Sequence, residues 1–479
     1  MLAGSVLSVI AIAATAVNAA NLGNPIFQQG QFSQQVYDGY NLLKHFGGNG
    51  PYTDGVGHGI DRNPPAQCEV DQVILIHRHG ERWPDPSVAE GMIAAYKKIL
   101  NTNLTLTGSL GFLNSWESFL DTPSLWAEET YSGPYAGLLN GFRRGVDYRA
   151  RYGHLWNGES IPIFSSGYER IIETARRFGL GFFGYNYTDS AYLNIIPETA
   201  DQGANSLTPV CYTESSTTTY GLSNFTQFAS AASRLNAENK GLNLNASDVY
   251  NLMLLAPFEL NGRPFSPWTD VFTLDEWVAF GYYNDLGYYY GGGGPGINTS
   301  AAIGAVYANA TLTLLNQGPS VGKLFFNFCH DTNITPILTA LGLFVPDKPM
   351  PVNYIKHDSI YKSTNFVPMG GHLVLERLSC NATSEHEAGT YVRTVVNEVV
   401  IPREDCQDGP GFSCPLANYT QTLNETLPDF RTACQVPEDY PQYLSFFWDF
   451  NQTNALNFQK GPIPYQLGAT TWNDQPLGS

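Results

Sequence analysis

The chain has 479 residues, of which 43% are hydrophobic and 14% charged, and its formal net charge is −18. This length and apolar content predict a large globular fold with a second lobe and exclude a disordered chain. The acidic balance argues against nucleic acid or an anionic membrane as a partner. Any site for an anion must therefore be a local concentration of positive charge.

The first residues indicate export from the cell. Residues 2–20 are small and apolar with no acidic residue, and Val17-Asn18-Ala19 offers a small-residue cleavage site, so we predict a signal peptide over residues 1–19. That run is too short for a good membrane span, and no later segment is long and apolar enough. Residues 20–65 are rich in Gly, Asn, Gln and Tyr. We expect them to form an N-terminal arm, which would contact a neighbouring subunit in a homo-oligomer.

Residues 73–84 join a buried strand to a cluster of basic residues. Residues 73–76 are all apolar and predict a strand that is buried on both faces. Arg78, His79 and Arg82 follow directly. Ligands of open α/β sheets bind at the carboxyl ends of strands, and the planar fork of Arg matches phosphate oxygens. The segment therefore predicts an anion site at the end of this strand.

A second apolar run, residues 161–164, predicts a short strand. Ser166 and Glu169 follow with the spacing of a capping box, which places Arg170 in the first turn of a helix. Because helix N-termini favour anions, Arg170 adds to the predicted site.

A third apolar run, residues 324–329, predicts another buried strand that ends at His330 and Asp331, with a helix after it. If the three strands are neighbours in one parallel sheet, three arginines, two histidines and one aspartate converge on one crevice. Residues 371–379 and 391–402 predict two further strands that pair antiparallel.

This set of residues suits the hydrolysis of a phosphate ester without a metal, so no cofactor is expected. The reaction needs positive charge on the phosphoryl oxygens, a nucleophile, and an acid for the leaving oxygen. Neutral imidazole attacks phosphorus, which suits His79. Asp331 suits the acid, provided that its pKa is raised enough for it to be protonated at the working pH.

The chain contains more glycosylation sequons than its composition alone would give, as expected of a secreted glycoprotein that carries N-linked glycans. We expect no glycan on Asn333, because Pro336 follows its Thr335 and the sequon lies close to His330 and Asp331. The other sequon asparagines are Asn103, Asn186, Asn224, Asn245, Asn298, Asn309, Asn381, Asn418, Asn424 and Asn451.

Seven cysteines indicate an oxidising compartment, and no pair has the C-x-x-C spacing of a zinc site. The number is odd, so at least one thiol is free or pairs between chains. We expect Cys329 to be the free one, because it ends an apolar run and should be buried. Cys406 and Cys414 are close enough for a local disulfide loop.

The segment Arg78-His79-Gly80-Glu81-Arg82-Trp83-Pro84 matches the R-H-G-x-R-x-P motif of histidine acid phosphatases. Further segments, such as Phe446-Phe447-Trp448-Asp449, resemble the yeast and fungal branch of that family, with its secreted acid phosphatases and phytases. The Lys-rich tract that follows the motif in filamentous-fungal phytases is replaced here by residues 85–90. This difference argues against strong specialisation for phytate, which is myo-inositol hexakisphosphate.

The resemblance implies a role for each motif residue. His79 would be the nucleophile that forms a phosphohistidine, and Asp331 would protonate the leaving group. Arg78, Arg82, Arg170 and His330 would hold the phosphate. The family also implies three disulfides, namely Cys68–Cys380, Cys211–Cys434 and Cys406–Cys414.

We predict an α/β fold similar to phosphoglycerate mutase, with a mixed central sheet, helices on both faces, and a smaller α-helical domain built from insertions. The α/β catalytic domain is assigned to residues 66–100, 155–215 and 316–479. The inserted helical domain is assigned to residues 101–154 and 216–315.

The predicted function is that of a secreted acid phosphatase for phosphomonoesters, including phytate. An alternative from another class is an inactive cell-wall or glycan-binding glycoprotein on the same fold, which the complete Arg, His and Asp set argues against. A phosphomutase would be cytosolic, contrary to the signal peptide. A glycosidase would need a matched carboxylate pair, and none is evident.

Overall fold

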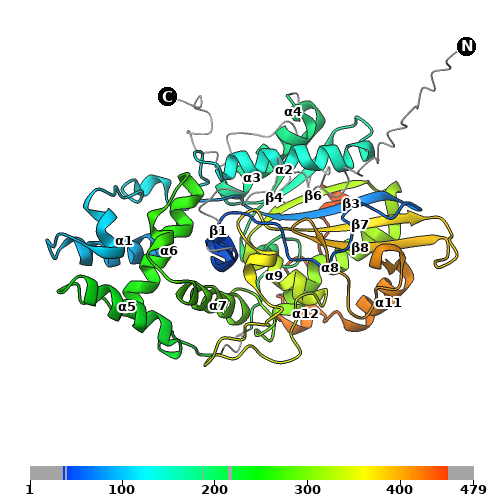
Figure 1. The fold of residues 1–479 in the computed structure, drawn as a ribbon. Helices are drawn as coiled ribbons and strands as arrows, with labels where there is room; N and C mark the ends of the chain where they lie inside the picture. Colours follow the sequence, from blue (N-terminus) through cyan, green and yellow to red (C-terminus); the bar gives the residue numbers. More distant parts are fainter. Residues whose placement is uncertain (1–35, 38–39, 186, 214–217, 451–479) are drawn as a thin grey trace, which may run out of the picture.

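A mixed β-sheet forms the centre of the protein (Figure 1). The computed structural model describes residues 36–37, 40–185, 187–213 and 218–450. Within these residues the sheet has eight strands in the order β10-β8-β7-β3-β6-β4-β5, with β9 paired to β8. The predicted signal peptide, residues 20–35 of the predicted arm, Asn186 and Asn451 lie outside the described residues. The strands of the sheet are β3 (Cys68–Arg78), β4 (Ile161–Ser166), β5 (Ala191–Ile196), β6 (Leu324–Cys329), β7 (His372–Cys380), β8 (Gly389–Val396), β9 (Val399–Val400) and β10 (Cys414–Pro415).

The three strands predicted to end in functional residues are neighbours. β3 runs parallel to β6, and β6 runs parallel to β4. The predicted strand at residues 371–379 is confirmed as β7, which pairs antiparallel with both β3 and β8. The predicted strand at residues 391–402 is instead divided by a turn at Asn397 and Glu398 into β8 and β9, which pair antiparallel. The carboxyl ends of β3, β6 and β4 therefore lie side by side at one edge of the sheet.

Helices cover both faces of the sheet, and the α/β fold class is thereby confirmed (Figure 1). α2 (Gly137–Tyr152) and α3 (Glu169–Phe183) lie on one face, where Val73 and Leu75 of β3 enter their core. On the other face lie α8 (Ser300–Gln317), α9 (Asp331–Ala340), α11 (Leu416–Thr426) and α12 (Phe430–Ala433). Ile74 and Ile76 enter that second core. This alternation of β3 is that of a strand buried on both faces.

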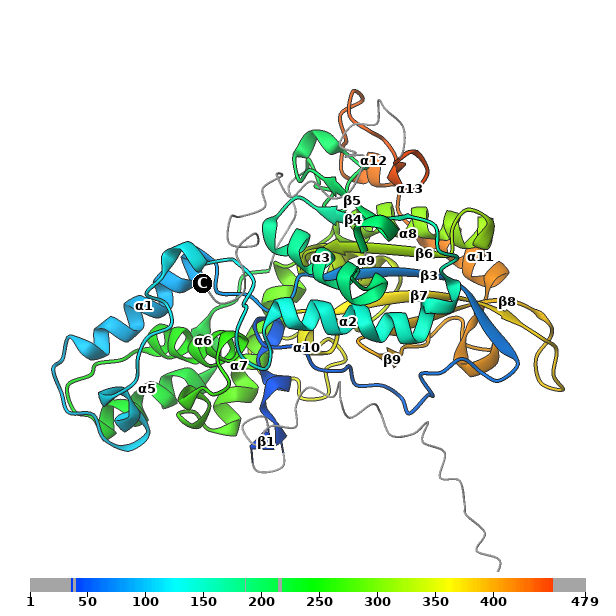
Figure 2. The same ribbon diagram turned by 90° about the horizontal axis from the view of Figure 1, so that it is seen from above.

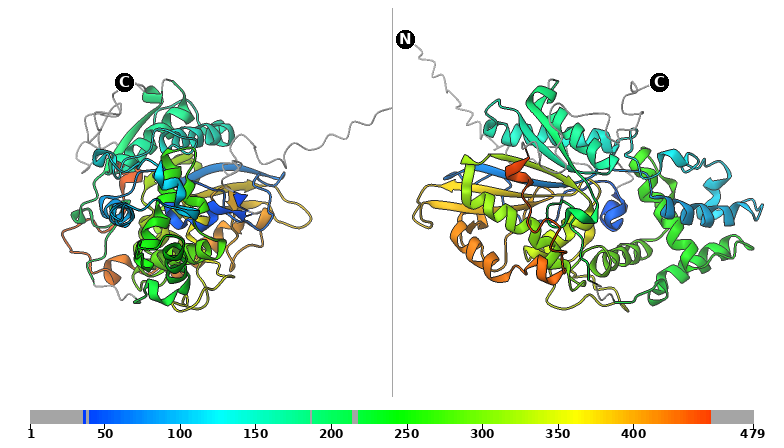
Figure 3. Two further views of the ribbon diagram at one scale, coloured as in Figure 1. Left: turned by 60° about the vertical axis from the view of Figure 1, so that its left-hand side comes forward. Right: turned by 180° about the vertical axis from the view of Figure 1, so that it is seen from behind.

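A helical lobe projects from the end of the sheet at which β3 finishes (Figure 2, and from behind in Figure 3). It consists of α1 (Pro86–Leu100), α5 (Thr226–Glu238), α6 (Ala246–Gly262) and α7 (Leu274–Tyr290). α6 and α7 each begin with a capping box, at Asn245 and Thr273. The short elements are β1 (Val36–Tyr37), β2 (Tyr40–Asn41), α4 (Tyr187–Ser190), α10 (Ser363–Phe366) and α13 (Phe446–Asp449).

The predicted domain boundaries differ from the helix contacts at three places. α1 was assigned to the α/β domain but packs on α6 in the helical lobe. α2 and most of α8 were assigned to the inserted domain, whereas α2 packs along α3 and α8 packs against α9. Apolar periodicity shows that a helix has a buried face, but it does not show which element covers that face.

The predicted capping box at Ser166 is wrong. Ser166 is the last residue of β4 and pairs with Ile196 of β5, which keeps its backbone extended. α3 begins at Glu169, and its N-cap residue is Tyr168, whose side chain makes no capping hydrogen bond. Arg170 nevertheless lies in the first turn of α3, as predicted.

The described part of the predicted arm is built into the core. Leu42, Leu43 and Phe46 are fully buried, and Phe46 packs edge-on against Trp277 of α7. Residues 42–46 therefore pack within the fold of this chain.

The cysteines and the sequons lie as the sequence predicted. The three disulfides join Cys68 to Cys380, Cys211 to Cys434 and Cys406 to Cys414, and Cys329 is free and buried. Asn333 is half-buried at the start of α9. The described asparagines of the other sequons are all exposed, namely Asn103, Asn224, Asn245, Asn298, Asn309, Asn381, Asn418 and Asn424. Within the described ranges, no helix is long and apolar enough to cross a membrane.

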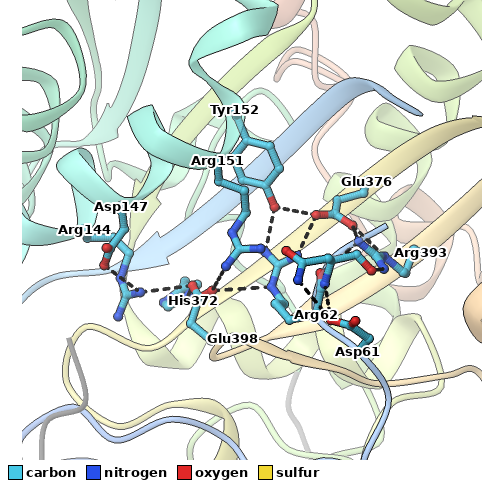
Figure 4. Close-up of polar contacts among 11 residues, drawn as sticks. Asp61, Arg62, Arg144, Asp147, Arg151, Tyr152, His372, Glu376, Arg393 and Glu398 are labelled. Carbon is cyan, nitrogen blue, oxygen red and sulfur yellow. Dashed lines mark hydrogen bonds and ion pairs between the residues drawn. The ribbon is translucent and has the colours of Figure 1, made fainter. Parts of the chain in front are cut away.

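A cluster of charged residues is buried on the face of the sheet that α2 covers (Figure 4). Glu376 of β7 forms ion pairs with Arg62 at 2.7 Å and with Arg393 at 2.6 Å. Glu398 contacts Arg62, Arg144 and His372. Burial alone would raise the pKa of Glu376, but Arg62 and Arg393 overcome that effect and lower its pKa to about 2.

We predict that two buried carboxyls give opposite slopes to the dependence of stability on pH. The pKa of Glu376 is depressed, so its contribution to stability is present above about pH 4.5 and is lost as the pH falls toward 2. Burial raises the pKa of Asp285 from 3.8 to about 7, so stability falls as the pH rises through that interval. Thermal unfolding at pH 2 to 7 measures both effects.

Glu376→Gln should destabilise the protein by about 3–5 kcal/mol at pH 6, because it leaves buried arginines uncompensated, and by much less at pH 2. In Asp285→Asn, the loss of stability between pH 4 and pH 7 should be smaller than in the wild type. Asp358→Asn, at an exposed carboxyl, serves as the control. Melting curves that keep the wild-type pH dependence in both variants would contradict this account.

Candidate active site

Arg78 is the last residue of β3, and its guanidinium is buried at the centre of the site. Nη1 donates to the carbonyl oxygens of Gly48 and Val367, each at 2.6 Å. Nη2 lies 2.7 Å from Oδ2 of Asp331. Segments from three distant parts of the chain therefore hold this one side chain.

His79 follows Arg78 and is 1% exposed. Its Nδ1 lies 2.8 Å from the carbonyl oxygen of Gly80. A carbonyl only accepts, so Nδ1 carries the hydrogen and the Nε2 lone pair is left free. Burial lowers the pKa of His79 well below its ordinary value, and the charges of Arg78, Arg170 and Arg82 lower it further. Both effects favour the neutral imidazole, which is the form that can act as a nucleophile.

Three arginines surround this imidazole with unused donors. The Nε atoms of Arg78, Arg82 and Arg170 are buried and have no hydrogen-bond partner among the described residues. A buried donor without a partner is costly, and guanidinium donors match the oxygens of phosphate. These three N–H groups, together with the positive charge of their guanidiniums, make a candidate anion site beside His79.

His330 and Asp331 lie at the end of β6, where α9 begins. The His330 ring meets the His79 ring edge-on, with centroids 6.1 Å apart. His330 Nε2 donates to Glu198, whose oxygens lie 3.0 and 3.1 Å away. Burial raises the pKa of Glu198, but the hydrogen bond from His330 and its charge lower it overall. The hydrogen bond to Glu198 thus fixes the orientation of the His330 ring in the site.

The expectation that Asp331 has a raised pKa is wrong for this structure. Burial does raise its pKa, but the guanidinium of Arg78 and the hydroxyl of Tyr288 overcome burial and lower it to about 2. Tyr288 donates to Oδ2 at 2.5 Å. Asp331 is therefore a carboxylate here. The sequence predicted that Arg78 and Asp331 meet in one crevice, but it did not indicate Tyr288.

The turn before β7 holds the backbone of the catalytic segment in place. The amide of Arg78 donates to the carbonyl of Gly371, and the amide of Gly370 donates to the carbonyl of His79, both at 2.8 Å. The amide of Arg82 contacts the sulfur of Met369 at 3.3 Å. Gly370 has φ +72°, in the left-handed region that favours glycine.

Gly80 allows a close approach on the other side of the segment. Its amide donates to Glu129 and to the hydroxyl of Thr174, both at 2.8 Å. A Cβ at Gly80 would lie 2.5 Å from Glu129 Oε1 and 2.9 Å from the Cα of Gly137. Any side chain here would push the segment away from α2.

The structure brings together all six residues that the sequence proposed: Arg78, His79, Arg82, Arg170, His330 and Asp331. Within the described residues, no group of three or more His, Cys, Asp or Glu is arranged to hold a metal ion. The profile of the histidine phosphatase superfamily (branch 2) matches residues 69–397. The chain belongs to this superfamily. The resemblance seen in the sequence motif is thereby confirmed.

Several histidine phosphatases are similar to this chain over most of its length. A phytase of Candida albicans, Phytase PHO112, is 39% identical over 439 residues, covering 89% of this chain and 94% of the relative. Acid phosphatase PHO1 of Komagataella pastoris is 39% identical over 438 residues, covering 87% and 92%. The crystal structure of the phytase from D. castellii superposes with a TM-score of 0.81 at 32% identity, covering 92% of this chain and 97% of that one.

Sequence reasoning missed the residues of this histidine phosphatase that reach the site from elsewhere. Tyr288 comes from α7 of the helical lobe, and Glu198 follows β5. A Cβ at Gly48 would meet the Tyr288 hydroxyl at 2.0 Å, so Gly48 makes room for that ring. The pattern Gly47-Gly48-Asn49-Gly50 was the visible signal, because such a run indicates close packing of backbone.

We predict that Tyr288→Phe raises the pKa of Asp331 from about 2 toward its ordinary value of 3.8. A hydrogen bond to the charged form of an acid favours that form, so its removal must raise the pKa. Carbon-13 NMR of aspartate-labelled protein measures this directly. Tyr283→Phe is the matched control, because Tyr283 lies on the same helix and has no role at Asp331. An unchanged pKa in Tyr288→Phe would show that the hydroxyl does not act on Asp331.

Proposed function

We propose that this protein is a secreted acid phosphatase that hydrolyses phosphomonoesters through a phosphohistidine on His79. The observation that carries the proposal is the neutral imidazole of His79, with Nε2 free, beside three buried guanidinium N–H groups that lack a partner among the described residues. The site thus contains a nucleophile and a receptor for the phosphoryl oxygens. The names of the similar proteins, a phytase and an acid phosphatase, support the same class of reaction.

In the first step, the Nε2 lone pair of His79 attacks phosphorus and the bond between phosphorus and the ester oxygen breaks. The electron pair of that bond leaves with the oxygen, which takes a proton from Asp331. In the second step, Asp331 accepts a proton from water, whose oxygen attacks the phosphohistidine. Orthophosphate leaves and the imidazole of His79 is regenerated. Arg78, Arg82, Arg170 and His330 hold the phosphoryl oxygens throughout.

The proton on Asp331 follows from substrate binding. A phosphoryl group that binds to Arg78 competes with Asp331 for the same guanidinium and adds negative charge beside it. Both effects raise the pKa of the carboxyl. The second pKa of a phosphate monoester is near 6, so at acid pH the substrate itself brings a proton into the site. An acid optimum therefore arises from the proton that the substrate brings to Asp331.

Secretion and glycosylation are part of the proposal. The three disulfides suit an oxidising compartment, and the exposed sequon asparagines are accessible to glycan transfer. The substrates we propose are small phosphomonoesters, phytate among them, because two of the similar proteins are named phytases. An inactive glycoprotein on this fold would have no ligand for the unused donors of three buried guanidiniums. No observation favours that alternative.

His79→Ala should lower kcat for hydrolysis of an aryl phosphate by at least about 10⁴-fold while leaving the melting temperature unchanged. Reactions with ³²P-labelled substrate that are quenched in alkaline detergent, in which phosphohistidine is stable, should show labelled wild-type protein and unlabelled variant. His357→Ala is the control, because this exposed histidine also precedes an aspartate but lies outside the site. Labelling of the His79 variant would assign the nucleophile to another residue.

Asp331→Asn should slow esters with poor leaving groups by about 10²–10⁴-fold and activated aryl esters much less. The reason is that a good leaving oxygen departs without a proton. The measurement is kcat/KM across a series of leaving-group pKa values, with Asp358→Asn as the control. Equal losses along the series would remove Asp331 from the role of acid.

A further inference from the structure

Asp85 lies at the mouth of the site, and its side chain does not make the capping hydrogen bond that is usual for its position. It is the N-cap residue of α1 and lies between Pro84 and Pro86, which restrict its backbone. An aspartate at an N-cap ordinarily accepts a hydrogen bond from the first turn of the helix. Here the side chain makes no such bond.

The carboxylate of Asp85 instead lies between two of the three arginines of the anion site. Its Oδ2 is 2.5 Å from Nη2 of Arg82, and its Oδ1 is 4.0 Å from Nη1 of Arg170. The side chain of Asp85 is 38% exposed, whereas those of Arg82 and Arg170 are 10% and 11% exposed. The carboxylate can therefore rotate toward solvent, while both guanidiniums remain buried in the site.

Both arginines have other partners that keep them in place. Nη1 of Arg82 donates to the carbonyl of Trp83 at 2.9 Å. The guanidinium of Arg170 lies 4.8 Å from the centroid of the Tyr168 ring. The arginines do not need Asp85 to point into the site, so its main effect is electrostatic.

We propose that Asp85 determines specificity as an internal competitor, whose carboxylate occupies the two guanidiniums and weakens the binding of phosphate groups. A phosphoryl group that binds Arg82 and Arg170 competes with this carboxylate for the positive charge of both guanidiniums. The two flanking prolines keep the displaced carboxylate at the mouth, where it repels any second phosphate on the same substrate. The competition disfavours substrates with several phosphates relative to simple monoesters. This preference among substrates rests on the proposed function, whereas the effect on phosphate binding does not.

The direct test is calorimetric titration of the full chain with inorganic phosphate at low salt. In Asp85→Asn the Kd for phosphate should fall about tenfold, a typical change for removal of one nearby like charge. Glu90→Gln is the matched control, because Glu90 is an exposed acid on the same helix, and its Kd should stay within about twofold of wild type. A Kd for Asp85→Asn that is unchanged or higher would overturn the proposal and make Asp85 a positioning residue for the arginines. Asp85→Ser gives the same comparison if the amide variant folds poorly.

Kinetics separate this proposal from the proposed function. In Asp85→Asn, KM for an aryl phosphate should fall with kcat nearly unchanged, and KM for phytate should fall by a larger factor. An equal fall for both substrates would overturn the claim about several phosphates. If neither protein hydrolyses a phosphomonoester while Asp85→Asn binds phosphate more tightly, the proposed function fails and the competition stands.

Discussion

The structure around the site depends on the burial of one positive charge, that of Arg78. A guanidinium away from water needs partners for its donors, and the protein supplies them from places far apart in the chain. The backbone carbonyls of Gly48 and Val367 accept hydrogen bonds from Nη1, and Asp331 forms an ion pair with Nη2. The N-terminal segment, the turn before β7 and the start of α9 are thereby fixed relative to β3. The Nε of Arg78 has no partner among the described residues and is available to a ligand.

The opposite face of the same strand also carries polar rings and charges. His77 stacks on His372 with centroids 5.2 Å apart, and His372 stacks on Tyr52 at 5.6 Å. The guanidinium of Arg144 lies 4.5 Å above the Tyr52 ring, and Glu398 joins Arg144 to His372. The cluster in Figure 4 is therefore continuous with the layer directly behind the catalytic segment. Both faces of β3 near its end are built from compensated charge, which gives the site a rigid support.

The sequence predicted the parts of this arrangement that have a local pattern. Apolar runs identified β3, β4 and β6. His79 directly follows β3, His330 and Asp331 directly follow β6, and Arg170 lies four residues after the end of β4. What it missed depends on contacts between distant segments. The acceptors at Gly48 and Val367 are backbone carbonyls, which every residue has, so no residue type indicates them. Tyr288 lies in a helix with many tyrosines, and only the fold singles it out. The pKa of Asp331 depends on both Arg78 and Tyr288, so it could not be predicted before their positions were known.

The central place of β3 in the sheet has a consequence for how the chain reaches its folded state. β3 pairs with β6 and β7, which follow more than two hundred residues later, and the Cys68–Cys380 disulfide spans 312 residues. Closing such long loops is slow, because the entropy of the loop is lost before the contacts form. During synthesis the apolar strand that leads to His79 lacks both neighbours until β6 has emerged, and it lacks β7 until later still. The helical lobe has far shorter connections between α5, α6 and α7 and can assemble first. We therefore expect the site around His79 to be among the last parts of the molecule to form.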